Sequence, residues 1–164
     1  MKHLRLQPDS PQRLRLSGLD PVLLDCLQSL PAILEQRDAP GVRPRLFPDP
    51  ATSPEANRDW QQFVAPELNH LFVAAGETLV RDLSTLAADP DHKNHFQVTF
   101  AADHLSAWMS ALNQARLILG ELFGITESDM NKADLDLEQP KDLAIFRINV
   151  LGYLLQLLVE FSSD

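Results

Sequence analysis

The sequence contains a single cysteine, Cys26, among its 164 residues. One cysteine cannot form an intramolecular disulfide bond, so a cross-linked secreted scaffold is excluded and a reducing compartment fits the composition. The N-terminus alternates apolar and polar residues and lacks the continuous apolar segment of a secretory signal. We therefore expect a cytoplasmic protein. A chain of this length can bury a sizeable core without a metal or a disulfide.

Basic residues are few. The chain has 14 Lys and Arg against 23 Asp and Glu, a formal net charge of −9, and residues 46–164 carry the acidic excess. Because an acidic surface repels phosphate backbones, we expect no nucleic acid partner. Long hydrophobic runs are also scarce. Residues 140–161 approach the length of a membrane span, but Arg147 and Asn149 interrupt them, so we expect no membrane insertion.

Several catalytic and metal-binding motifs are missing. The sequence has no glycine-rich phosphate loop, no Gly-x-Ser-x-Gly nucleophile elbow and no His-Glu-x-x-His. Glu67-Leu-Asn-His70 has the spacing used in di-iron bundles, but such a site needs a second pair and two further glutamates on facing helices. We therefore identify no catalytic residue, metal ligand or cofactor. The sequence leaves open whether the chain is an enzyme, and it favours a protein that is not.

Periodicity predicts a single, mainly α-helical domain over 1–164 with a small antiparallel sheet. Leucine and arginine alternate on both sides of a proline-rich turn, which predicts a β-hairpin over residues 2–17. A second period-two run predicts a strand over 95–100. Because a two-stranded ribbon is marginal alone, we expect this third strand to pair with the hairpin.

Capping residues and the 3.6-residue period predict a bundle of four main helices, over 20–37, 54–88, 101–124 and 140–161. Pro66 lies inside the second helix and should bend it. A proline-rich connector over 38–54 and an acidic loop over 126–142 join the helices. The helix over 140–161 is apolar almost all round, so we expect it to be the central and most buried element.

Arg116 is the most informative polar residue. In helical projection it lies at the edge of the apolar face that carries Trp108, with Asn113 and Gly120 about one turn away on either side. A guanidinium beside an apolar face is costly unless it is paired. The helix over 101–124 should therefore hold a specified polar contact between Arg116 and either a carboxylate or several backbone carbonyls.

Glu67 and Asp82 are candidate partners for Arg116, because both project onto the apolar side of the helix over 54–88, and Glu160 is a third. In the structural interpretation, which we favour, they form ion pairs that fix helix register. Arg116→Ala would then cost about 3–5 kcal/mol. In the functional interpretation, Arg116, Asn113, Glu67 and Asp82 bind a polar ligand or perform acid–base chemistry.

Four segments carry a family resemblance: Pro44-Arg-Leu-Phe-Pro-Asp-Pro50, Pro54-Glu-Ala-Asn-Arg-Asp-Trp-Gln-Gln-Phe63, Ala107-Trp-Met-Ser-Ala-Leu-Asn-Gln-Ala-Arg-Leu-Ile-Leu-Gly-Glu-Leu-Phe-Gly-Ile125 and Tyr153-Leu-Leu-Gln-Leu-Leu-Val-Glu160. Across residues 20–161 the chain resembles an uncharacterised bacterial, largely actinobacterial, domain-of-unknown-function family. The genes of that family often lie beside the ClpS proteolytic adaptor and a JAMM-type metalloprotease. The resemblance implies an all-helical bundle and a role near regulated proteolysis, and it supplies no catalytic residues.

These observations predict a non-enzymatic interaction or regulatory module with an unidentified protein partner. A homodimer that closes over residues 140–161 is a further interpretation. The alternative function is a small-ligand sensor or an unassigned enzyme built on Arg116, Glu67 and Asp82. An exposed apolar patch over a filled core would favour the interaction module, and a cavity with a trapped anion beside Arg116 would favour the alternative.

Overall fold

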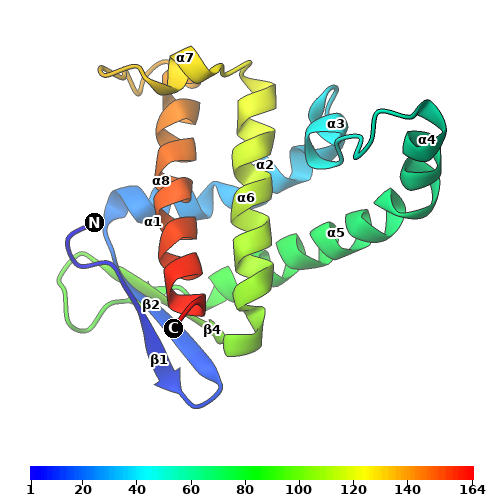
Figure 1. Ribbon diagram of the computed structural model, residues 1–164. Helices are drawn as coiled ribbons and strands as arrows, with labels where there is room; N and C mark the ends of the chain where they lie inside the picture. The colour runs from blue at the N-terminus through cyan, green and yellow to red at the C-terminus, as the bar shows by residue number, and fades with distance from the viewer.

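The computed structural model describes residues 1–164 and is mainly α-helical with a small four-stranded antiparallel sheet (Figure 1). This confirms the predicted class. In chain order the elements are β1 (Arg5–Ser10), β2 (Arg13–Leu19), α1 (Pro21–Gln28), α2 (Leu30–Leu34), η1 (Glu35–Asp38), α3 (Val42–Leu46), α4 (Pro54–Phe63), α5 (Ala65–Asp82), η2 (Leu83–Thr85), β3 (Ala87–Ala88), β4 (Phe96–Ala101), η3 (Ala102–His104), α6 (Leu105–Leu122), α7 (Glu127–Met130) and α8 (Pro140–Ser162).

The sheet has the strand order β1-β2-β4-β3. β1 and β2 form the expected N-terminal hairpin, and β4 pairs antiparallel with β2 as the third strand. Leu16 pairs with Val98 and Leu14 pairs with Phe100, and all four side chains are buried. The short strand β3 adds a fourth member that the sequence analysis missed, because a two-residue strand has no readable period.

Gly18 creates a bulge in β2, where the register with β4 shifts between Leu16 and Leu19. Its φ is +72°, and a Cβ atom at this position would lie 1.9 Å from the carbonyl oxygen of His3. Only glycine fits such a contact in this backbone conformation. The bulge frees the N–H of Gly18, which donates to Asp89 Oδ2 at 2.9 Å and so connects the hairpin to the loop before β4.

Prolines divide two of the predicted helices. The helix predicted over 20–37 is split into α1, α2 and η1, and Pro31 lies in the first turn of α2. The helix predicted over 54–88 is split at Val64, and Pro66 occupies the first turn of α5. A proline cannot donate a helical hydrogen bond, and its ring clashes with the carbonyl four residues earlier. The chain therefore breaks where a bend was expected.

Two segments predicted as irregular contain short helices. The connector over 38–54 contains α3, which is preceded by the N-cap residue Gly41 with a φ of +81°. The loop over 126–142 contains α7, whose first turn is closed by a capping box between Thr126 and Asp129.

The helices do not form the predicted four-helix bundle. α6 and α8 stand side by side and antiparallel, whereas α5 runs across them and ends near the sheet (Figure 1). α6 is the central helix, since it packs against α8, α5, α3 and α2. The fully buried Trp108 of α6 stacks on Phe100 of β4 with ring centroids 4.5 Å apart.

The prediction that α8 is the central and most buried helix is therefore wrong. Leu151, Leu154 and Leu158 face the core, but Leu155 is half-buried and Tyr153 is exposed. By length and composition α8 could cross a membrane, with a mean hydropathy of 1.6 over 18 residues, 44% of them buried. The same length and composition are found in helices that form the core of a folded domain, as α8 does against α6.

Candidate functional site

Arg116 and Asn113, two of the predicted site residues, line one cavity of about 290 Å³. Both belong to α6, one turn apart, and Gly120 lines the same cavity one turn further on. Two more charged side chains reach it, Arg45 from α3 and Glu127 from α7.

Arg116 is held by the backbone of α8 and not by an acid. Its Nε donates to the carbonyl oxygen of Ile148 at 3.2 Å. The guanidinium lies over Gly152, where a Cβ atom would be 3.2 Å from its Cζ. The favoured ion pair between Arg116 and Glu67, Asp82 or Glu160 is therefore wrong. The other predicted kind of partner, a backbone carbonyl, is present because a glycine on the facing helix lets the arginine reach the main chain. Removing Arg116 leaves no acid unpaired, so the large loss of stability no longer follows.

Glu67 does not belong to this cavity. It is an exposed residue in the first turn of α5, and its side chain has no hydrogen-bond or ion-pair partner in the protein. Asp82 ends the same helix, about 22 Å away along the axis. Helical projection misplaced Glu67, because the break at Val64 changes the register of α5 relative to α4.

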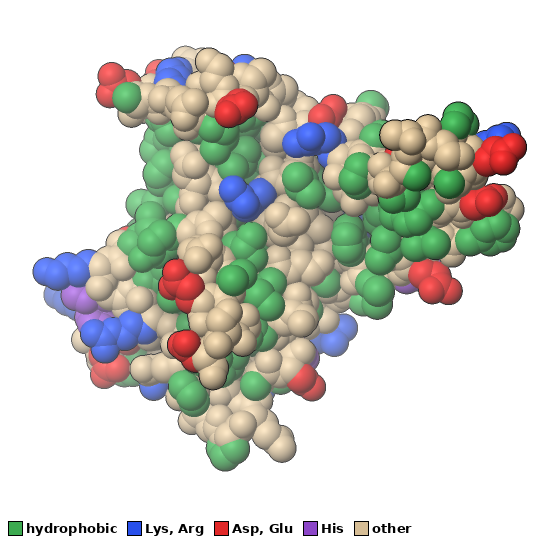
Figure 2. All heavy atoms as spheres, viewed as in Figure 1, with side chains coloured by type: hydrophobic (Ala, Val, Ile, Leu, Met, Phe, Trp, Pro, Cys, Tyr) green, Lys and Arg blue, Asp and Glu red, His purple; other side chains and the backbone are tan.

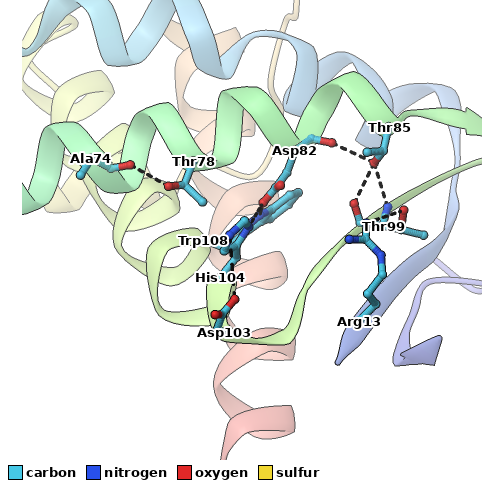
Figure 3. Close-up of polar contacts among 9 residues, drawn as sticks. All are labelled: Arg13, Ala74, Thr78, Asp82, Thr85, Thr99, Asp103, His104 and Trp108. Carbon is cyan, nitrogen blue, oxygen red and sulfur yellow. Dashed lines mark hydrogen bonds and ion pairs between the residues drawn. The ribbon is translucent and has the colours of Figure 1, made fainter. Parts of the chain in front are cut away.

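Asp82 holds a buried network between α5 and α6 (Figure 3). Its Oδ2 accepts a hydrogen bond from Trp108 Nε1 at 2.9 Å and lies 2.9 Å from His104 Nδ1. Its side chain is 10% exposed. The other ring nitrogen of His104 lies 3.9 Å from a carboxylate oxygen of Asp103 and contacts no hydroxyl or thiol. The Asp–His pair therefore has the orienting part of a catalytic triad without a nucleophile. The hydrogen bond from Trp108 to Asp82 joins α5 to α6, and His104 joins α5 to η3.

The Thr85 hydroxyl extends the network to the sheet. It lies 2.8 Å from the carbonyl oxygens of both Asp82 and Thr99, and it accepts the N–H of Thr99 at 3.0 Å (Figure 3). Arg13 of β2 donates to the Thr99 hydroxyl at 3.3 Å. The end of α5 is thus joined to β4 and the hairpin as well as to α6.

Asp89 was not among the predicted site residues, and its side chain is 1% exposed. Its carboxylate accepts the N–H groups of Gly18 and Asp91, each at 2.9 Å, and lies 3.3 Å from His92 Nδ1. The His92 ring in turn packs against the His3 ring in a tilted arrangement, with centroids 4.3 Å apart. In the sequence, only the Asp-x-x-His spacing of Asp89 and His92 pointed to this cluster. The N–H donor of Gly18 could not be predicted, because it comes from a distant part of the chain.

The contacts of Asp89 shift its acidity. Burial by itself raises the pKa of this carboxyl, but the N–H groups of Asp91 and Gly18 and the contact with His92 outweigh burial and hold the pKa below its ordinary value of 3.8. The folded state therefore favours the ionised form. The stability gained is complete above the unfolded pKa and is lost as the pH falls from there through the folded pKa.

We expect the free energy of unfolding to fall as the pH is lowered below about 5, and part of that fall to disappear in Asp89→Asn. The variant should be less stable at pH 7 and should lose less stability on acidification. Urea denaturation at several pH values measures both effects. The control is Asp91→Asn, which changes an exposed side chain and keeps the backbone donor. If the free energy of unfolding fell equally with decreasing pH in the wild type and in Asp89→Asn, this role of Asp89 would be contradicted.

A second surface feature is the arm, which we define as residues 54–75, comprising α4 and the first part of α5. It projects from the body of the molecule (Figure 1), and hydrophobic side chains gather along it (Figure 2). α4 contains no buried residue. Phe63 and Leu71, 65% and 64% exposed, are the two most exposed large hydrophobic residues of the chain.

Comparison with curated proteins and with solved structures found no match. A family model described as Domain of unknown function (DUF2017) matches residues 7–162. This match spans β1 to α8 and includes the cavity, the Asp82 network and the arm. The chain therefore belongs to the family Domain of unknown function (DUF2017).

Proposed function

We propose that the protein is a non-enzymatic interaction module that binds another protein through the arm. The exposure of Phe63 and Leu71 carries this proposal. Burying a large apolar side chain gains about 1.5–3 kcal/mol, so two such residues on a projecting element favour a partner that covers them. Fully buried residues such as Leu79 show that α5 is anchored in the core beyond the arm.

The charge of the arm favours a basic partner. Residues 54–75 contain three acids, Glu55, Asp59 and Glu67, and one basic residue, Arg58, in a chain of net charge −9. A partner that presents apolar side chains rimmed by lysine or arginine complements this surface and is steered toward it. Nucleic acid carries the wrong charge, and we propose a cytoplasmic protein as the partner.

The resemblance to a family whose genes often lie beside the ClpS adaptor makes components of regulated proteolysis the first partners to test. Gene neighbourhood is an association and does not identify a physical contact. A homodimer is the second partner to test. The alternative of one enzyme or sensor site formed by Arg116, Glu67 and Asp82 is not proposed, because neither acid lines the Arg116 cavity.

The test is affinity capture from the source cells with wild-type protein and with the double variant Phe63→Ser/Leu71→Ser. We expect the variant to fold like the wild type, within about 0.5 kcal/mol, because both side chains are exposed, and to lose the captured partner. The matched control is Val22→Ser/Tyr153→Ser, which removes two other exposed hydrophobic residues and should keep the partner.

Retention of every wild-type partner by the arm variant would end the proposal, as would loss of the partner by the control alone. Sedimentation of the purified chain tests the homodimer. A dimer that dissociates in the arm variant identifies a second copy as the partner, whereas a dimer unaffected by it places self-association elsewhere.

A further inference from the structure

The cavity beside Arg116 combines a fixed cation with apolar walls. Asn113 and Arg116 supply its polar side from α6, and Ile125 and Met130 supply apolar surface from the segment that leads through α7. Its volume of about 290 Å³ lies just below the range of about 300–1,000 Å³ typical of ligand pockets. A ligand for it is therefore small and partly apolar.

The guanidinium of Arg116 is oriented before any ligand binds. One of its five N–H groups is used by the carbonyl oxygen of Ile148, and the backbone at Gly152 supports its plane from the α8 side. The four N–H groups on its two η nitrogens have no hydrogen-bond partner in the protein. These N–H donors lie in one plane, and their geometry allows two of them to bind the two oxygens of a carboxylate.

The other charges of the cavity favour a single negative charge on the ligand. Arg45 also lines the cavity, but its side chain is 56% exposed and lies 4.0 Å from a carboxylate oxygen of Glu121. Glu127 adds a negative charge to the lining. A dianion such as phosphate would be repelled by Glu127 and would leave the apolar walls unused. A carboxylate with an apolar body can contact both the Arg116 guanidinium and the apolar walls.

We propose that this cavity binds a small organic monocarboxylate, with its carboxylate on Arg116 and its apolar body against Ile125 and Met130. The site lies outside the arm, since no residue of 54–75 lines the cavity. Binding there does not require the partner of the arm.

The test is a titration of the isotope-labelled full chain with hexanoate, followed by the NMR signals of the backbone amides. We expect saturable shifts at Asn113, Arg116, Ile125 and Met130. Hexanol has the same apolar body without the charge, and inorganic phosphate has the charge without the body. Neither should produce these shifts.

Substitutions test whether hexanoate binds to the Arg116 guanidinium. Arg116→Gln should weaken hexanoate binding by at least about tenfold, because a charge-assisted bidentate contact is lost. Gly152→Ala should also weaken it, because the added Cβ would lie 3.2 Å from the guanidinium while every lining residue stays the same. Gly76→Ala is the matched control, since its Cβ would lie 3.1 Å from Nη2 of Arg37, an arginine outside the cavity. It should leave binding unchanged.

The proposal is overturned if hexanoate produces no saturable shift, if phosphate or hexanol binds as tightly, or if Arg116→Gln binds as the wild type does. The proposal for the arm and the proposal for the cavity can be contradicted independently of each other. Phe63→Ser/Leu71→Ser should still bind hexanoate, and Arg116→Gln should still capture the partner of the arm.

Discussion

Replacing Asp82 with alanine should lower the free energy of unfolding by about 2–4 kcal/mol, measured by urea denaturation followed by circular dichroism. The carboxylate accepts from Trp108 Nε1 inside the core and contacts His104 at the protein surface. Without it, a buried indole N–H has no acceptor and the tie between α5 and α6 is lost. An unsatisfied buried donor alone costs about 1–3 kcal/mol.

Two further variants separate this effect from a general sensitivity of the region. Asp103→Ala removes a neighbouring carboxylate that is 89% exposed, and it should change stability by less than about 0.5 kcal/mol. Trp108→Phe removes the indole donor, so its effect and that of Asp82→Ala should be less than additive in the double variant. Additive effects, or an Asp82→Ala protein as stable as the wild type, would show that the hydrogen bond contributes nothing.

Leu154→Ala should cost about 2–5 kcal/mol of unfolding free energy, because the side chain is 1% exposed and its removal leaves a cavity in the core. Val159→Ala is the control on the same helix. It removes two methyl groups from a residue that is 40% exposed, and it should have a much smaller effect. If the two substitutions had equal effects, the face of α8 assigned to the core would be wrong.

Local features of this protein were readable from the sequence because their causes lie within a few residues. Asp20 caps α1 by accepting the N–H of Leu23, as a polar residue before a proline predicts. The alternating leucines of the hairpin face the core because the side-chain period of a strand is two. Pro66 interrupts the long helix for a reason intrinsic to proline, and only the extent of the break was underestimated.

Asp82 shows how much of a polar site can be predicted from the helical period. Its position on the apolar side of a helix predicted correctly that it needs a polar partner, but the partner is the Trp108 and His104 pair and not an arginine. Periodicity gives the face of a side chain on its own helix. It carries no information on which element lies opposite.

Only the tertiary structure decided the surroundings of Arg116, the centre of the core and the role of Asp89. The arginine reaches a carbonyl of α8 because Gly152 leaves room, 36 positions further along the chain. α6 displaces α8 from the centre because α5, α3 and α2 all pack on it. Asp89 is fixed by an N–H that a bulge at Gly18 sets free. Each outcome depends on the contact between elements distant in sequence, and the helical or strand period of one element does not encode that contact.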